Sequence, residues 1–368
     1  MLKLEFCRER QARLLRQMER AKVELAILGN PKTIYYFTGA LLDPTQAQAF
    51  AIAASGHSLL VTNSEPRECV AHRIETYTAY SLDRLFSRAS VNAEVAAAVS
   101  RFAAHVPGPA AVEFESVSSG VLDALQGRAV VNLTPDLMEM RRRKDPDEIE
   151  AMRATTELTE AGYAAIKARL EPGMTENEAH VIMYEAMVRH AGTSVDLRGD
   201  FACGTRAITG GAPTDRKVQS GDLYILDIFP MFEGYMCDLC RTFAAGPPTQ
   251  LQQDAWAHIM EAHELAQRLI RPGASCRAIY EEIRTQLDRF EPAKGSFYHH
   301  AGHGLGMDAW EFPWLIPGSD QVIQEGDVIA CEPGLYSEAL AGGIRLEHNY
   351  LVGKDSVTTL DTFPMDLR

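Results

Sequence analysis

The second part of the chain is built twice from one pattern. Pro172-Gly173-Met174-Thr175 returns as Pro272-Gly273-Ala274-Ser275, 100 residues later, and each copy stands between two predicted helices. The phrase GDLYILD at 221–227 likewise returns as GDVIACE at 326–332. An internal repeat of this kind restricts the architecture strongly, because equivalent units fold alike and pack together. The sequence therefore predicts two helix–helix–hairpin units related by a pseudo-twofold axis.

Each copy of the repeated phrase ends in a carboxylate, and a second carboxylate follows on the return strand. Asp227 and Glu332 end the two phrases, whereas Asp238 and Glu347 each lie four residues after a glycine. Apolar residues precede Asp227 and Glu332, so these two carboxylates are expected to be buried. Burying a lone carboxylate costs several kcal/mol or forces it to take a proton. Four converging carboxylates would repel one another. We therefore predict two divalent cations among them; the alternative, separate surface acids on edge strands, is disfavoured by the matched spacing.

A fifth candidate ligand, His303, lies between the two copies in the string YHHAGHGLGMDAWEFP. The glycines around it, Gly302, Gly304 and Gly306, permit close approach of the backbone. A dinucleotide-binding loop is excluded, because the glycine spacing is wrong and nothing basic follows. One imidazole among four carboxylates is a mostly hard donor set, which favours Mn²⁺, with Co²⁺ or Zn²⁺ as alternatives.

The length of 368 residues favours two domains, and 46% hydrophobic with 23% charged residues is typical of a globular protein. Residues 1–138 alternate helix and strand patterns, which predicts a small α/β domain before a second domain at 139–368. The predicted fold class is thus α/β (α+β). The pattern DPDEIEAM, in which Asp145 caps a helix and Pro146 is its first residue, opens the second domain. Thr175 and Ser275 are expected to cap later helices.

The net charge of −14 disfavours a nucleic-acid partner, because phosphate binding requires a basic surface. The basic run RRRK at 141–144 is followed at once by acidic residues, so we expect a solvated linker there. No apolar run approaches the ~20 residues of a membrane span, and the charged N-terminus does not resemble a signal peptide. The seven cysteines do not have the spacing typical of a small disulfide-bonded protein, which fits a reducing compartment. A cytoplasmic location is therefore expected.

The pair Cys237-x-x-Cys240 straddles Asp238 in a predicted strand. A CxxC motif often indicates zinc or redox chemistry. Side chains three residues apart in a strand point to opposite faces, so the two thiols cannot share a metal without a bulge. We expect structural cysteines.

The ordered set of five candidate ligands resembles the ligand set of the pita-bread metallopeptidases, which include methionine aminopeptidase, prolidase and Xaa-Pro aminopeptidase. The segments GYMCDLCRTF, GHGLGMD, CEPGLY and GGIRLEHNYLV are similar to the motifs of that family. The segment RRRKDPDEIEAMR resembles its interdomain junction, and the preceding α/β domain resembles that of the prolidase and creatinase branch. The resemblance covers nearly the whole chain, and it implies a creatinase-like domain followed by a pita-bread domain.

The resemblance also implies a dinuclear hydrolase with assigned roles for these side chains. Asp227 would chelate one metal, His303 would bind the other, and Asp238 and Glu347 would bridge them. Glu332 would be both a ligand and the carrier of the proton that reaches the leaving amine. Relatives with this layout are commonly dimers, so a homodimer is expected.

Three further positions match the family outside the ligand set. His299, four residues before His303, resembles a substrate-contacting catalytic histidine; the alternative is a capped surface histidine in the His299-His300 pair. Arg345 would orient Glu347 or meet a substrate carboxylate, the alternative being a surface ion pair. Tyr336 would line the pocket with its hydroxyl, although a packed core tyrosine fits its position as well.

Two positions depart from the family pattern. The histidine expected seven residues after the ligand histidine is Trp310, and the histidine of a proline–histidine pair is Gly210. These imidazoles hold the substrate in the family, and such donors are worth ~3 kcal/mol each to an oxyanion. Another histidine or arginine, such as His299 or Arg206, could substitute for them; alternatively the substrate has changed. Both Trp310 and Gly210 are therefore candidate substrate-binding positions.

The leading hypothesis is a metal-dependent exopeptidase of the prolidase or Xaa-Pro aminopeptidase type that hydrolyses short peptides. The second is a small-molecule C–N hydrolase or lyase on the same metal scaffold, with a small amide as substrate, because Gly210 and Trp310 depart from the pattern. A third, a non-catalytic binding module, is disfavoured because all five ligands are present and such modules do not need them. Fold analogy alone does not fix the reaction.

Overall fold

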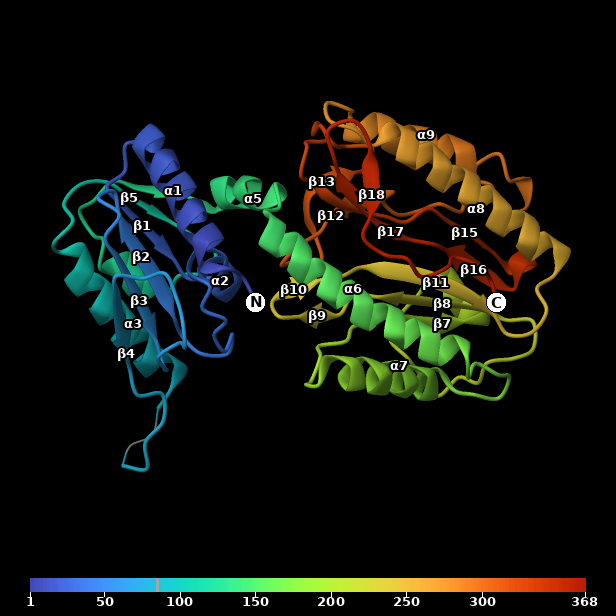
Figure 1. Ribbon diagram of the computed structural model, residues 1–368, viewed down its shortest axis with the longest axis horizontal. Helices are drawn as coiled ribbons and strands as arrows, with labels where there is room; N and C mark the ends of the chain where they lie inside the picture. The colour runs from blue at the N-terminus through green and yellow to red at the C-terminus, as the bar shows by residue number, and fades with distance from the viewer. Residues whose placement is uncertain (84–85) are drawn as a thin grey trace. The chain divides into compact units, whose positions relative to one another are not determined.

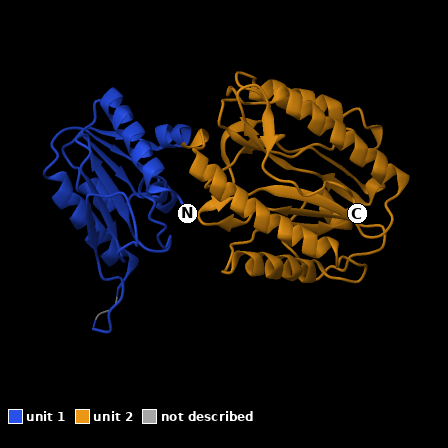
Figure 2. Ribbon diagram, in the orientation of Figure 1, with its two compact units in different colours: residues 1–140 blue, residues 141–368 orange. Residues whose placement is uncertain are grey.

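A computed structural model describes residues 1–83 and 86–368 of the chain. These residues form two compact units, 1–140 and 141–368, which Figure 2 shows in different colours. Each unit combines helices with sheets and has its own hydrophobic core. The predicted α/β class, with a smaller N-terminal domain and a larger second domain, is confirmed.

The first unit is a six-stranded sheet of order β4-β3-β2-β1-β5-β6. Its strands are β1 (Leu25–Leu28), β2 (Ala49–Ala53), β3 (Ser58–Thr62), β4 (Arg73–Thr76), β5 (Ala110–Val112) and β6 (Val130–Asn132). β2 and β3 form an antiparallel hairpin, whereas β1 pairs in parallel with β5. Its helices are α1 (Leu4–Ala21), α2 (Pro31–Thr38), α3 (Arg88–Ala103), α4 (Ser119–Asp123) and α5 (Thr134–Arg142), the last of which leads into the second unit.

The second unit contains two successive sets of elements. The first set is α6 (Pro146–Lys167), α7 (Glu176–Ala191), β7 (Gly199–Cys203), β8 (Leu223–Ile228), β9 (Met231–Phe232), β10 (Tyr235–Met236) and β11 (Leu239–Ala244). The second set is α8 (Gln250–Leu269), α9 (Cys276–Leu287), β12 (Gly302–Gly304), β13 (Glu311–Leu315), β14 (Val328–Cys331), β15 (Gly334–Ser337), β16 (Gly342–Arg345), β17 (His348–Val352) and β18 (Val357–Thr359). Short 3₁₀ helices lie at Gly204–Ile208, Glu291–Ala293 and Glu338–Leu340.

The strands of this unit form two main sheets, β11-β8-β7 and β13-β12-β14-β17-β18. One core joins α6 and α7 to the first sheet, and another joins α8 and α9 to the strands of the second set. Figure 1 shows the two helix pairs, green and orange, with the strands of the unit between them. The helix-covered strands are therefore buried, and any carboxylate on them is removed from bulk water.

Hydrogen bonds show that the two sets of elements are equivalent in detail. Gly173 N donates to Val218 O at 2.8 Å, and the corresponding Gly273 N donates to Ile323 O, also at 2.8 Å. Asp222 Oδ2 accepts from the backbone N–H three residues earlier and pairs with Arg216. The corresponding Asp327 does the same and pairs with Arg142. The repeat seen in the sequence is thus a repeat of turn structure.

Capping residues start the helices of this unit where the sequence predicts. Asp145 and Glu148 form a capping box before α6, with Pro146 as the first helical residue. Thr175 accepts a hydrogen bond from Glu178 N at the start of α7, and Ser275 accepts one from Ala278 N at the start of α9.

The basic run at 141–144 is not the solvated linker that the sequence predicts. Arg141 is buried against Glu311 and Asp308, with 2.6 Å to Asp308 Oδ2. Lys144 Nζ lies 2.9 Å from Glu311 Oε2, and Arg142 pairs with a buried aspartate at 2.8 Å. The prediction was wrong because the partner carboxylates lie far along the chain, where a local charge pattern cannot reveal them.

Within residues 1–83 and 86–368, no helix is both long and apolar enough to cross a bilayer.

Candidate metal centre

The five candidate ligands lie on or beside neighbouring strands of the second unit. Asp227 is on β8 and His303 on β12; Asp238 directly precedes β11, Glu332 follows β14, and Glu347 lies between β16 and β17. All five side chains are buried. Gly302 and Gly304 flank the histidine, and a β-carbon at either position would overlap a backbone carbonyl of the adjoining strand. Glycine at these positions therefore lets the three strands pack closely around the imidazole.

The side chains of this set converge on one place. His303 Nε2 lies 3.6 Å from Asp238 Oδ2 and 3.6 Å from Glu332 Oε1. Ligand atoms of Asp238, His303 and Glu347 all lie within 4.8 Å of one another. Asp227 is close enough to raise the pKa of both Asp238 and Glu347 by charge repulsion. The structure thus places the predicted carboxylates and the imidazole around a common centre.

Protonation of the cluster reflects burial and mutual repulsion. Burial raises the pKa of Asp227 to about 7, which Arg345 opposes and Glu332 reinforces. Burial and the neighbouring carboxylates also raise the pKa of Asp238 and Glu347 well above the ordinary range. Without added positive charge, these groups hold protons at a pH where free carboxyls have lost them.

Hydrogen bonding leaves part of the cluster without partners. Asp227 Oδ1 and both oxygens of Glu347 are buried and accept no hydrogen bond from any residue that the structure describes. Buried polar atoms without partners are rare and require an explanation. A divalent cation supplies one, since carboxylate oxygens with a single imidazole are ligands that such ions prefer. The residues present therefore fit a metal centre.

Glu332 differs from the other carboxylates because histidines surround it. His300 Nδ1 lies 3.0 Å from its Oε1, and His299 Nδ1 lies 3.8 Å from its Oε2. Burial would raise the pKa of Glu332, but His300, His299 and His303 outweigh it and hold the pKa at about 2. Glu332 is thus the carboxylate of the cluster that stays ionised.

The structure places His299 inside the site rather than on the surface. Its Nε2 lies 2.7 Å from the Tyr336 hydroxyl, and its Nδ1 faces the His300 carbonyl at 2.8 Å. Burial lowers the pKa of His299 to about 4. His300, which the sequence argument considered only within the surface alternative, is the imidazole nearest to Glu332. Both imidazoles therefore lie beside the same carboxylate, His300 the closer of the two.

Arg345 is buried and connects several groups of the site. Its Nη2 lies 2.6 Å from Asp227 Oδ2 and 2.8 Å from Asp200 Oδ2, and its Nη1 donates to the Tyr336 hydroxyl at 3.4 Å. The surface ion pair considered as an alternative is wrong. The orientation differs from the expectation as well, because the partner of Arg345 is Asp227 rather than Glu347.

Gly210 and Trp310 lie outside the ligand cluster. Gly210 has a φ of 73°, and a β-carbon there would overlap the carboxylate of Asp200. That carboxylate accepts a hydrogen bond from Gly211 N at 2.8 Å, and its side chain is 31% exposed. Trp310 is 66% exposed. Gly210 thus leaves room for the carboxylate of Asp200.

A second tryptophan, Trp314, lies nearer the cluster than Trp310 does. Its ring centroid is 5.6 Å from that of His303 and 5.5 Å from that of His300, whereas Trp310 reaches only Trp314, at 6.4 Å. Trp314 pairs with His303 across the sheet, a register that only the structure reveals.

Further groups position the backbone of the ligands. Asn349 exchanges two hydrogen bonds with the backbone of Asp238, and Arg241 Nη1 donates to Glu347 O at 2.6 Å. The thiols of Cys237 and Cys240 have different neighbours: Thr156 Oγ1 lies 3.5 Å from the first, and the second donates to Arg345 O at 3.2 Å.

Comparison with known families matches both units. A sequence profile described as metallopeptidase family M24 matches residues 150–354, and one described as the creatinase/prolidase N-terminal domain matches residues 10–143. The Xaa-Pro dipeptidase of Pyrococcus horikoshii is 21% identical over 96% of this chain and 96% of its own length. The putative dipeptidase YkvY of Bacillus subtilis is 27% identical over 70% of this chain and 72% of its own.

Solved structures share the fold over nearly the whole chain. The prolidase from Pyrococcus horikoshii superimposes with a TM-score of 0.83 at 21% identity, covering 98% of this chain and 100% of the other. The X-Pro aminopeptidase from Thermotoga maritima gives a TM-score of 0.82 at 22% identity, covering 97% and 98%. Both units, in the same order along the chain, are therefore common to this molecule and these structures.

Proposed function

The chain belongs to metallopeptidase family M24, and on that premise we propose that it is an exopeptidase of the prolidase or Xaa-Pro aminopeptidase type. Its substrates would be short peptides, and two divalent cations would assist the hydrolysis. The observation that carries this proposal is the convergence of four buried carboxylates on one imidazole, with three carboxylate oxygens left without a hydrogen-bond partner among the described residues.

Asp227, Asp238, His303, Glu332 and Glu347 would hold the cations. When bound, two such cations lower the pKa of water and polarise a carbonyl group. The donor set favours Mn²⁺, with Co²⁺ or Zn²⁺ as alternatives. The raised pKa values of Asp238 and Glu347 mean that loading with cations would release protons from the site.

Glu332 is the proposed proton carrier. It is ionised at neutral pH, so it can accept a proton at a carboxylate oxygen and return it to the leaving amine. His300, at 3.0 Å, is placed to orient that carboxylate. His299 and Tyr336, joined by a hydrogen bond of 2.7 Å, would contact the substrate together with Arg345.

Specificity would depend on the two departures from the family pattern. The partly exposed carboxylate of Asp200, next to Gly210, would attract the ammonium group of a free peptide N-terminus. Trp310 would offer an apolar surface to a side chain of the substrate. The second candidate, a non-peptidase C–N hydrolase or lyase acting on a small amide, is motivated by the same two positions, Gly210 and Trp310.

A panel of peptides tests the proposal. Purified protein reconstituted with Mn²⁺ is incubated with Xaa-Pro dipeptides, Xaa-Pro tripeptides and proline-free dipeptides, each free, N-acetylated or C-amidated. We expect hydrolysis of peptides with a free N-terminus and little hydrolysis of N-acetylated ones. Absence of turnover on the whole panel, in protein shown to contain metal, would remove the peptidase and leave the second candidate for metabolite profiling.

The homodimer is extrapolated from the resemblance, and the location in the cell from the cysteine content of the sequence. A homodimer and a cytoplasmic location stay predictions, as does the boundary between residues 138 and 139. Sedimentation analysis of the full chain tests the first of these, since a monomer at micromolar concentration would contradict it.

A further inference from the structure

Two aspartates face each other across the strand pair β7–β8. Asp200 in β7 is the direct partner of Asp227 in β8 in the antiparallel register. Side chains at such paired positions lie on one face of the sheet, about 5 Å apart, and like charges there are destabilising. Asp227 is a candidate metal ligand, whereas Asp200 is not one of the five. The position of Asp200 therefore requires a compensating positive charge.

A single guanidinium nitrogen connects the two carboxylates. Arg345 Nη2 lies 2.6 Å from Asp227 Oδ2 and 2.8 Å from Asp200 Oδ2. Arg345 is only 7% exposed, and a buried charge that loses its partner is strongly destabilising. The bond from its Nη1 to the Tyr336 hydroxyl supplies no negative charge. Arg345 therefore depends on the two carboxylates.

A cation in the metal centre would compete with Arg345 for Asp227. Asp227 Oδ1 has no hydrogen-bond partner among the residues that the structure describes, whereas Oδ2 faces the guanidinium. A bound cation and the guanidinium repel each other, so a cation on Asp227 weakens the pair that Asp227 forms with Arg345. Asp200 is then the carboxylate that compensates the charge of Arg345.

The orientation of Asp200 does not depend on Arg345. Asp200 Oδ1 accepts a hydrogen bond from Gly211 N at 2.8 Å. Gly210, with a φ of 73°, leaves the space that the carboxylate occupies, since a β-carbon there would overlap Asp200 Oδ2. The backbone of residues 210–211 thus directs Oδ2 towards Arg345. The Asp200 side chain is 31% exposed, so this pairing leaves part of the carboxylate open to a substrate.

From these contacts we infer that Asp200 is a positioning residue of the metal centre: it holds the Arg345 guanidinium, so that Asp227 is available to cations. Asp200 acts through Arg345 and is not itself a ligand. Without the charge of Asp200, Arg345 pairs with Asp227 alone and competes with cations for that carboxylate. The inference rests on the metal centre of the proposed function but not on peptide hydrolysis.

A double-mutant cycle in Mn²⁺ affinity tests the inference. Isothermal titration calorimetry follows Mn²⁺ binding to the full-length, metal-depleted protein for the wild type, Asp200→Asn, Arg345→Gln and the double variant. Asparagine keeps the shape and the acceptor for Gly211 N but has no charge. We expect Asp200→Asn to weaken binding at least about tenfold in the wild-type background, and less than about threefold in the Arg345→Gln background, where no guanidinium competes.

Three results would overturn the inference: no Mn²⁺ binding by the wild type, unchanged Mn²⁺ affinity in Asp200→Asn, or an equal loss of affinity in both backgrounds. In the last case Asp200 would act on the cation by its own charge rather than through Arg345. Arg345→Met is a second uncharged background if Arg345→Gln does not fold. Since the readout is metal binding, a failure of this cycle is distinguishable from a failure of the peptide panel.

The control for Asp200→Asn is Asp196→Asn, which removes the same charge four residues earlier. Asp196 and Arg198 form an exposed pair at 2.9 Å, and such pairs contribute little. We expect Mn²⁺ affinity within about twofold of the wild type. A tenfold loss in Asp196→Asn as well would contradict a role that is specific to Asp200.

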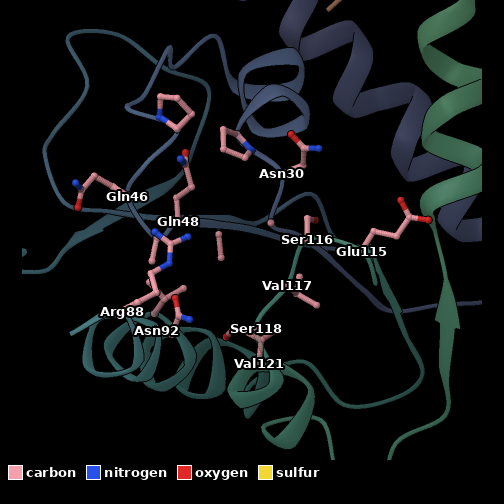
Figure 3. A pocket seen from close by; sticks show the side chains of 16 residues that line it. Asn30, Gln46, Gln48, Arg88, Asn92, Glu115, Ser116, Val117, Ser118 and Val121 are labelled. Carbon is pink, nitrogen blue, oxygen red and sulfur yellow. The ribbon is translucent and has the colours of Figure 1, made fainter. Parts of the chain in front are cut away.

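The control for Arg345→Gln removes a guanidinium from the first unit. Arg88 lines a pocket of about 290 Å³ at the carboxyl ends of β1 and β5, where Figure 3 shows it beside Asn92. The pocket is lined by residues 29–31 after β1, residues 115–118 after β5, the segment before β2 and one face of α3. We expect Asp200→Asn to lose the same affinity in the Arg88→Gln background as in the wild type. Recovery in that background would mean that net charge explains the coupling, and it would contradict the inference.

Discussion

At the scale of single residues, Glu332 has the most demanding position. It lies in a cluster of carboxylates, yet three histidines keep it ionised. We expect Glu332→Gln to keep the fold and to lower kcat on a cleaved peptide about a hundredfold to ten-thousandfold, because the proton carrier is lost. Steady-state kinetics at matched metal content, measured by elemental analysis, provide the test.

The matched control for that variant is Glu338→Gln, which changes an exposed glutamate six residues along the chain. It should leave kcat unchanged. Near-normal turnover in Glu332→Gln would show that another group carries the proton.

Gly210 and Asp200 form a second test at this scale. A β-carbon at 210 would overlap the Asp200 carboxylate, and φ there is 73°. Gly192, with a φ of 68° and open space around it, is a control for the backbone cost alone. We expect Gly210→Ala to lower the free energy of unfolding more than Gly192→Ala, by about 1–3 kcal/mol.

A double-mutant cycle assigns that extra cost. In Asp200→Ala, the three atoms nearest to the new β-carbon are gone, so adding Gly210→Ala should cost little beyond the backbone strain. Urea unfolding of the four proteins measures the coupling. Additive effects of the two substitutions would mean that the glycine does not make room for the aspartate.

Some residues of the candidate site could be identified from the sequence, and others could be found only in the structure. The four carboxylates could be found because the repeat places them at matching positions, and His303 because glycines surround it. Asp200 could not, since its partner Arg345 lies 145 residues away and no motif contains it. His300 was overlooked because the family pattern gives weight to His299 alone, and Trp314 because the pattern directs attention to Trp310.

At the scale of helices and strands, capping residues and the repeated apolar segments were enough to predict helix starts and the two carboxylate-bearing hairpins of the second unit. Pro146 and Thr175 mark helix starts that depend on contacts within a few residues. The prediction for the basic run at 141–144 failed because its stabilising partners belong to β13, to the loop before β13 and to the turn before β14. Local patterns therefore predict where elements begin, but not which distant charges they bury.

That buried charge cluster gives a pH-dependent prediction. Burial would raise the pKa of Glu311, but Arg141 and Lys144 outweigh it and lower the pKa from 4.5 to about 2. A depressed carboxyl pKa stabilises the fold above the unfolded-state value, and this stability is lost as the pH falls towards 2. Glu311→Gln should cost about 3–5 kcal/mol at pH 7, since it removes the partner of a buried lysine.

Urea unfolding between pH 7 and pH 3 measures this effect as the difference between the wild type and Glu311→Gln, which should shrink below about pH 4.5. Glu291→Gln, which breaks an exposed pair with Lys294, should change little at any pH. A difference that grows on acidification would have the wrong sign for this explanation.

At the scale of the whole molecule, each unit has its own core, and only the second contains the candidate metal centre. We expect Mn²⁺ to raise the thermal transition of the second unit relative to chelator-treated protein. Binding at a hundredfold excess over Kd contributes ~2.7 kcal/mol. Differential scanning calorimetry with and without chelator measures the shift.

The control for the metal effect is Asp238→Asn, which removes one charge from the cluster without adding volume. It should reduce the shift caused by Mn²⁺ and leave the transition of the first unit unchanged. An identical shift in this variant would mean that the metal binds elsewhere.

The two-domain organisation and the fold class could be predicted from the chain length, the alternating helix and strand patterns, and the internal repeat. The pocket of the first unit could not, because its lining comes from four segments that have no common sequence pattern. The order of the strands in the sheet brings these segments together, so the pocket can be recognised only once that order is known.

The duplicated turn structure also bears on how such a protein could have arisen. Each half contributes two of the four carboxylates, so a half-length ancestor would have carried an incomplete cage. Two copies facing each other would have supplied all four carboxylates. Fusion into one polypeptide would then have freed the halves to diverge, which fits an imidazole that is present in one of them without a counterpart in the other.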